Sequence, residues 1–138
     1  MKAITISQPF ASLIAIGEKF VENRSWPTRY RGPLAIHAGK GTQYLTKGEV
    51  SAQGLSYGQV VAICKLQACV ELDPLKDLFD RHLCGEAVSA PSGLDMSRVD
   101  AILNHEYTEG PWCWVLGDVE PLPSPMEAVG KQGLWNWE

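Results

Sequence analysis

An alternation over fourteen residues, with one face wholly apolar, marks residues 59–72 as the clearest strand of the chain. Apolar side chains fill every second position on one face: Val60, Ala62, Cys64, Leu66, Ala68, Val70 and Leu72. The other face carries four polar residues, Gln59, Lys65, Gln67 and Glu71. A period of two is typical of a half-buried strand. A strand this long usually bends around a barrel or enters a hairpin.

Weaker patterns predict further strands at 2–6, 19–24, 34–38 and 112–119. A short helix is expected after the first strand, because Ser7 is a favoured N-cap, Pro9 is tolerated in a first turn, and Gly17 suits a helix end. Helices are also expected at 42–53, 75–83 and 95–105. These segments place short helices between strands without regular alternation.

Prolines at every second position predict an irregular extended tail after residue 119: Pro121, Pro123 and Pro125. The chain then ends in a short strand carrying Trp135 and Trp137, which we expect to close a barrel. Many strands with few, short helices favour a mixed α+β fold built on an antiparallel or closed sheet.

Composition bounds the class of protein. A length of 138 residues predicts a single domain, 1–138, and 45% hydrophobic with 20% charged residues is typical of a globular protein. No apolar run reaches the roughly 18 residues of a membrane span, and the start does not resemble a secretory signal. We therefore expect a cytoplasmic protein with no membrane partner.

Cysteine and histidine spacing predicts neither a metal site nor a cofactor. The four cysteines, Cys64, Cys69, Cys84 and Cys113, form no CxxC pair. His82 and His105 have no usable spacing with cysteines or acids. The cysteines are therefore expected to be reduced and mostly buried.

The formal net charge of −4 hides a strong asymmetry. Residues 1–70 hold eight Lys and Arg against three acids, whereas residues 71–138 hold four against thirteen. Five of the basic residues fall within 18–40, where only Glu18 and Glu22 oppose them. Binding of nucleic acid depends on the local field of such a patch more than on the total charge.

The segment 17–40 favours a cationic cleft for phosphate or a nucleobase. Arginine offers a planar donor fork to phosphate and also stacks on bases. Trp26 and Tyr30 are candidate stacking platforms. Glu22 and Arg24 are two apart on a predicted strand, so they share a face and can pair. The competing interpretation is a solvated turn in which Trp26 is a core residue.

His37, Trp112 and Trp114 are candidate site residues that a purely structural role would also explain. His37 ends an apolar strand, which favours a satisfied structural histidine, and Trp112 and Trp114 favour core positions. The motifs GxxxxGK[ST], GxGxxG, GxSxG and HExxH are absent from the sequence. This disfavours a P-loop ATPase, a Rossmann dehydrogenase, an α/β-hydrolase and a zinc protease.

Three motifs together resemble the ASCH domain (the activating signal cointegrator homology domain): QPxAxLI at 8–14, GxKxxExR at 17–24 and YRGPLxIHA at 30–38. The resemblance implies a small PUA-like mixed β-barrel flanked by short helices. It also implies RNA, single-stranded nucleic acid or a modified nucleoside as the ligand. It further implies that Ser7, Gln8, Lys19, Glu22, Arg24 and His37 converge in a cleft beside the first helix.

Some ASCH proteins are hydrolases, so an enzyme is the alternative. These include acetylcytidine amidohydrolases and ribonucleases, in which the lysine of the GxK element is catalytic. That role maps onto Lys19, with Glu22 as its partner, although the hydrolase relatives carry threonine at the position of Glu22. A third hypothesis is an interaction module that docks a basic partner on the acidic second half.

Nucleic-acid binding is the function that the sequence favours, with no cofactor and no metal. The predicted binding residues are Ser7, Gln8, Lys19, Glu22, Asn23, Arg24, Trp26, Arg29, Tyr30, Arg31, His37 and Lys40.

Overall fold

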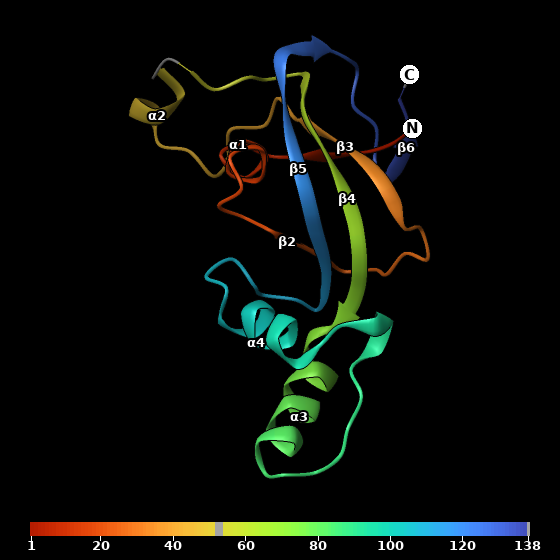
Figure 1. Ribbon diagram of the computed structural model, residues 1–138. Coiled ribbons are helices and arrows are strands. Elements are labelled where there is room, and N and C mark those ends of the chain that lie inside the picture. Colours follow the sequence, from red (N-terminus) through yellow and green to blue (C-terminus); the bar gives the residue numbers. More distant parts are fainter. Residues whose placement is uncertain (52–53, 138) are drawn as a thin grey trace. The chain divides into compact units, whose positions relative to one another are not determined.

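The computed structural model describes residues 1–51 and 54–137 (Figure 1). In chain order its elements are β1 (Lys2–Ile6), α1 (Phe10–Ala15), β2 (Val21–Arg24), β3 (Gly32–Ala38), α2 (Lys47–Ser51), β4 (Gln59–Glu71), α3 (Leu72–Leu83), the 3-10 turn η1 (Pro91–Gly93), α4 (Met96–Asn104), β5 (Trp112–Glu127) and β6 (Leu134–Asn136). The predicted mixed α+β class is confirmed. None of the described helices is long and apolar enough to cross a membrane.

The strands form one six-stranded sheet with the order β2-β5-β4-β3-β1-β6. β1 runs parallel to β3 and antiparallel to β6, and β2 runs antiparallel to β5. The alternation predicted for β4 is confirmed, because every even-numbered residue from Val60 to Val70 is buried. Val61 and Cys69 of the other face are buried as well, so that face is also covered in part.

The chain divides into two compact units. The first comprises Met1–Lys19, Gly32–Lys65 and Gly117–Glu138, and the second comprises Phe20–Arg31 and Leu66–Leu116. β4 and β5 each contribute residues to both units. The single domain over 1–138 stays a prediction.

The core of the first unit joins residues from both ends of the chain. Ala3, Ala35, Val60 and Trp135 form it, with Leu122, Ala128 and Trp137 packed against them. The amino group of Met1 donates to the carbonyl oxygen of Trp137 over 2.9 Å. The predicted C-terminal strand is thereby confirmed as β6, next to β1.

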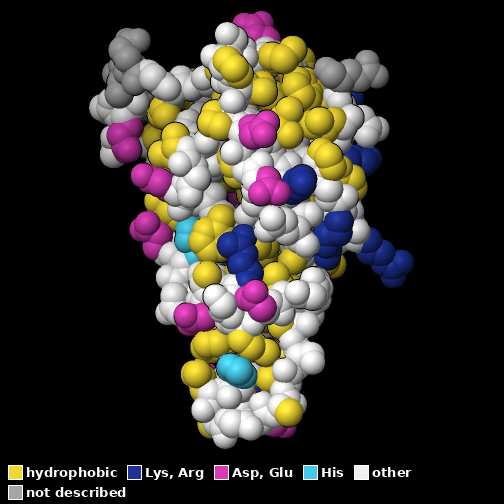
Figure 2. All heavy atoms as spheres, in the orientation of Figure 1, with side chains coloured by type: hydrophobic (Ala, Val, Ile, Leu, Met, Phe, Trp, Pro, Cys, Tyr) yellow, Lys and Arg dark blue, Asp and Glu magenta, His cyan; other side chains and the backbone are white. Residues whose placement is uncertain are grey.

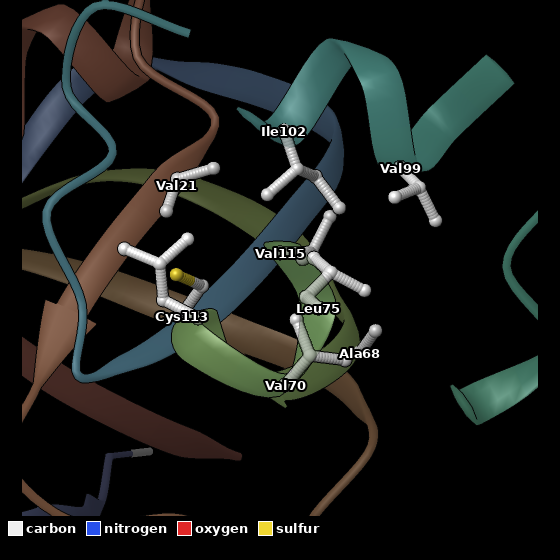
Figure 3. Packing of buried hydrophobic residues seen from close by; sticks show 9 residues of the cluster. Val21, Ala68, Val70, Leu75, Val99, Ile102, Cys113 and Val115 are labelled. Atoms are coloured by element: carbon white, nitrogen blue, oxygen red, sulfur yellow. The ribbon is translucent and has the colours of Figure 1, made fainter. Parts of the chain in front are cut away.

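The core of the second unit lies between its two helices and its strands (Figure 3). Val21 comes from β2, Cys113 and Val115 from β5, Ala68 and Val70 from β4, Leu75 from α3, and Val99 and Ile102 from α4. The helices therefore bury their apolar faces against the strands. This packing holds β2, which carries Glu22 and Arg24, against β5.

Three predicted helices differ in extent from the expectation. The helix expected at 75–83 is α3, which begins three residues earlier, at Leu72. α1 begins only at Phe10, and no side chain caps it. Gln8 precedes Pro9, and the residue before a proline is disfavoured in helical conformation, so the helix cannot begin directly after Ser7. The helix expected at 42–53 is α2, which Thr46 and Glu49 cap reciprocally through their side chains and backbone amides. Residues 52–53 lie outside the described residues.

The tail expected after residue 119 is wrong, because β5 continues as a strand to Glu127. Proline is compatible with a strand where its missing N–H faces an unpaired edge. Pro121, Pro123 and Pro125 alternate along β5, so their nitrogens face the same edge. β2 pairs only with residues 112–115 of β5, and no other strand among those described pairs with that edge.

Candidate nucleic-acid interface

Gln8 of the first unit is wholly buried, at 0% exposure, and both ends of its amide are bonded. Its Nε2 donates to the carbonyl oxygen of Ser56 over 2.8 Å, and its Oε1 accepts from the backbone N–H of Ser12 over 3.0 Å. The side chain thus joins the start of α1 to the segment that leads into β4. These two bonds use one N–H and one lone pair of the amide, which has a second N–H and a second lone pair.

Lys19 is buried although its side chain is ionisable, with only 3% of its surface exposed. It follows the end of α1, where Gly17 adopts a φ of 82° and the Lys19 N–H donates to the carbonyl oxygen of Leu13. Its Nζ lies 5.7 Å from the centre of the Phe10 ring. Lysines are rarely so buried without a specific reason, and the ring stabilises the ammonium through its negative face.

Tyr44 extends this arrangement to the surface. Its ring meets Phe10 edge-to-face with centroids 5.2 Å apart, and 59% of the residue is exposed. We call Phe10, Lys19 and Tyr44 the Lys19 cluster. Sequence reasoning missed Tyr44, because only the fold brings this loop residue to Phe10; the sequence signal was an aromatic residue in a polar stretch.

Two further polar residues of the first unit lie on loops near its surface. Gln43 donates from Nε2 to the hydroxyl of Ser7 over 3.3 Å. Lys40 is exposed, and its aliphatic chain crosses Gly58, where an added Cβ would lie 2.8 Å from the Lys40 Cε. Gly58 has a φ of 67°, which also favours glycine. The backbone at Gly58 therefore supports the side chain of Lys40.

His37 lies in a closed hydrogen-bond network of the first unit. Its Nε2 donates to the carbonyl oxygen of Ala128 over 2.7 Å, and its Nδ1 is hydrogen-bonded to the hydroxyl of Thr5 over 3.2 Å. Trp135 donates from Nε1 to the same hydroxyl over 3.2 Å. With both ring nitrogens engaged, the geometry favours the structural interpretation of His37.

Glu22 and Arg24 form the predicted ion pair in the second unit, with 2.8 Å between Glu22 Oε2 and Arg24 Nη2. Their side chains are 12% and 22% exposed. β2 places them in register with Trp114 and Trp112 of β5, respectively. The pairing predicted from their spacing of two is confirmed. It orients the Arg24 guanidinium at a partly exposed position.

Asn23 points to the other face of β2 and bonds to the segment after α4. Its Nδ2 donates to the carbonyl oxygen of Tyr107 over 2.8 Å. Its Oδ1 accepts from the backbone N–H groups of Glu109 and Gly110, each over 2.9 Å. The predicted contact of Asn23 with a base edge gains no support from this geometry.

The loop after β2 is ordered by its own contacts. The Trp26 ring meets the wholly buried Trp114 edge-to-face at 4.8 Å, and Trp114 donates from Nε1 to the Trp26 carbonyl oxygen over 3.3 Å. The core position predicted for Trp114 is confirmed. Arg31 donates from Nη1 to the carbonyl oxygens of Thr28 and Tyr30 over 2.9 and 2.8 Å. Arg31 therefore fixes its own loop, while exposed Arg29 has no ion-pair partner among the described residues.

The predicted residues are distributed over both units. Ser7, Gln8, Lys19, His37 and Lys40 belong to the first, and Glu22, Asn23, Arg24, Trp26, Arg29, Tyr30 and Arg31 to the second. Their convergence in one cleft stays a prediction. On the face drawn in Figure 2, Lys and Arg side chains lie in the middle and on the right, whereas most Asp and Glu side chains lie on the left and in the middle.

The described residues hold no group of three or more His, Cys, Asp or Glu that could bind a metal ion. All four cysteines are free, and Cys84 alone among them is exposed. Burial raises the pKa of the Cys64 thiol to about 12. Burial also raises the pKa of Cys69, against the opposing effects of a backbone hydrogen bond from Thr28 and the charge of Arg31.

Comparisons with known proteins place these features in a family. The sequence model of the ASCH domain matches residues 4–123. The chain is similar in fold to the crystal structure of ASCH from Zymomonas mobilis, with a TM-score of 0.55, 19% identity, and coverage of 99% of this chain and 87% of that one. A comparison with curated proteins found no match.

Two variants of the same Zymomonas mobilis protein match as well. A serine-to-alanine variant gives a TM-score of 0.54 at 19% identity, with coverage of 99% of this chain and 87% of that one. A tyrosine-to-phenylalanine variant gives 0.55 at 19% identity, covering 99% and 89%. At this identity the likeness establishes the fold, and the predicted PUA-like architecture is confirmed.

Proposed function

Because the chain belongs to the ASCH domain family, we propose that it binds RNA or a modified nucleotide through basic and aromatic side chains of residues 7–44. The observation that carries the proposal is the Lys19 cluster: a buried ammonium 5.7 Å from the Phe10 ring, with exposed Tyr44 on the edge of that ring. A cation attracts phosphate, and an exposed aromatic ring gives a base a surface to stack on, worth about 1–3 kcal/mol per base.

The cations of the second unit supply contacts of their own. Glu22 holds the Arg24 guanidinium in place, and a guanidinium is the side-chain group best suited to bind phosphate through charge-assisted hydrogen bonds. Arg29 is exposed and adds charge nearby in the sequence. In this proposal Ser7 and Glu22 make the hydrogen bonds to base edges, because the Asn23 amide bonds to the 107–110 segment and the buried Gln8 amide bonds to Ser56 and Ser12.

A titration of fluorescein-labelled single-stranded RNA by anisotropy tests the proposal. We expect affinity to fall as salt rises, because neutralised phosphates release counterions. Tyr44→Ala should weaken binding about tenfold through lost stacking, with little change in the salt dependence. Gln43→Ala is the matched control beside it. Binding without salt dependence and without loss in Tyr44→Ala would argue against the proposal.

The burial of Lys19 also favours a second candidate, hydrolysis of RNA or of a modified nucleoside such as acetylcytidine. A lysine in dry surroundings suits the role of general base or nucleophile. Incubation with acetylcytidine and with RNA, followed by chromatography, tests this candidate directly. Loss of turnover in Lys19→Gln supports it, and equal turnover in wild type and Lys19→Gln contradicts it.

We also propose a cytoplasmic location. The four free cysteines, of which one is exposed, fit a reducing compartment. Fractionation of cells that produce the chain tests this proposal, and recovery from an oxidising compartment would contradict it.

A further inference from the structure

Asn23 uses both ends of its amide to hold one segment. It donates to the Tyr107 carbonyl oxygen over 2.8 Å and accepts from the Glu109 and Gly110 amides over 2.9 Å each. These three bonds join a strand residue to a loop more than 80 positions away in the sequence. A side chain that makes this many bonds has one well-defined position.

The same loop also holds the residue that precedes β2. The backbone N–H of Phe20 donates to His105 Nε2 over 3.2 Å, and the two rings lie 4.0 Å apart. The Arg98 guanidinium lies 4.7 Å from the Phe20 ring, and its Nη2 lies 3.3 Å from the carbonyl oxygen of Leu116. The 105–110 segment and α4 therefore fix the chain on both sides of Val21 and Glu22.

β2 needs such support. It has four residues, and β5 is its single neighbour in the sheet order. So short an edge strand is held weakly by its backbone pairing alone. Side chains alternate between faces, so fixing Asn23 on one face directs Glu22 and Arg24 to the other. Their 2.8 Å ion pair lies on that opposite face.

We propose that Asn23 is a positioning residue, through which the 107–110 segment fixes Arg24 for its contact with a phosphate group of the ligand. This inference rests on the proposed function. Asn23 itself touches no ligand in this account. Its effect on binding passes through Arg24, which makes the two residues energetically dependent on each other.

A double-mutant cycle on RNA affinity tests the inference. Arg24→Ala should weaken binding about tenfold through loss of a charge-assisted hydrogen bond. It should also weaken the salt dependence, making the negative slope of log K against log salt shallower by about 0.7. Asn23→Ala should reproduce most of both effects. The double variant should bind no more weakly than Arg24→Ala alone, because the positioning effect has nothing left to act on.

Asn104→Ala is the matched control. Asn104 also uses its amide, donating to the carbonyl and carboxylate oxygens of Asp100 within α4, without a bond to β2. It should leave both the affinity and the salt slope unchanged. If Asn23→Ala fails to fold, Asn23→Asp keeps the two acceptor bonds to the Glu109 and Gly110 amides, with Asn104→Asp as its control for charge. We then expect a partial loss that again disappears in the Arg24→Ala background.

The outcomes separate this inference from the proposed function. Additive losses in the double variant, or an unchanged salt slope in Asn23→Ala, would overturn the positioning role while leaving RNA binding intact. Full affinity in Arg24→Ala would show that Arg24 makes no phosphate contact. That result would contradict both the Arg24 part of the proposed function and this inference.

Discussion

The wholly buried amide of Gln8 donates to the carbonyl oxygen of Ser56 over 2.8 Å. This single bond joins residues 48 positions apart, and the same amide accepts the N–H of Ser12 in α1. The helix that precedes Lys19 is thereby tied to the segment that enters β4. A residue whose type suggested base recognition is, in the structure, part of the frame of the site.

Removal of this amide should destabilise the protein. Gln8→Ala leaves the partly buried carbonyl group of Ser56 and N–H of Ser12 without their partner, so we expect the free energy of unfolding to fall by about 2–4 kcal/mol. Urea denaturation measures it. Gln43→Ala removes an exposed amide that bonds to Ser7 and should change stability by less than about 0.5 kcal/mol. Equal effects of the two variants would contradict the framing role of Gln8.

Gly130 leaves no room for a side chain against the His37 network. A Cβ there would lie 2.7 Å from both His37 Cε1 and Thr5 Oγ1. Gly130→Ala should therefore cost about 1–3 kcal/mol of stability through overpacking, measured by thermal denaturation. Gly48→Ala in α2 meets nothing closer than 3.9 Å and should be neutral or slightly stabilising. An unchanged melting temperature in Gly130→Ala would show that the ring of His37 is not held as described.

Stability should decline at alkaline pH in a way that depends on Cys64. Burial raises the pKa of this thiol from 9.0 to about 12. Between those values the unfolded chain releases the proton while the folded protein keeps it, so stability is full below pH 9 and is lost as the pH rises toward 12. The slope approaches about 1.4 kcal/mol per pH unit. Cys64→Ala should flatten this slope in urea denaturation series, whereas exposed Cys84→Ala should not.

The three prolines of β5 should protect an open strand edge. Their missing N–H groups remove donors that another chain would need for pairing. Replacement of Pro121, Pro123 and Pro125 by threonine restores those donors and should raise self-association, seen by light scattering at increasing protein concentration. Threonine at Pro91, in η1, is the control. A triple variant as monodisperse as the wild type would refute this role.

The sequence predicted most of the fold and the pairing of Glu22 with Arg24, for local physical reasons. The alternation along β4 and the spacing of Glu22 and Arg24 are visible in the residue order, because strand periodicity fixes which side chains share a face. The structure confirms both.

The features that sequence reasoning missed are the long-range ones. Nothing in the residue order shows that Tyr44 meets Phe10, or that the Asn23 amide serves residues 107–110. The prolines of β5 led to the wrong prediction of an irregular tail after residue 119. Proline is disfavoured in most strand positions but is compatible with an unpaired edge. Only the order of strands in the sheet shows that β5 has such an edge.

Titration of single-stranded RNA against Lys19→Met tests the central claim most directly. Methionine keeps the length of the side chain and its contact with Phe10 but removes the charge. With folding verified by thermal denaturation and exposed Lys76→Met of α3 as the control, we predict at least a tenfold loss of affinity for Lys19→Met alone. Equal affinity of Lys19→Met, Lys76→Met and wild type would contradict the account.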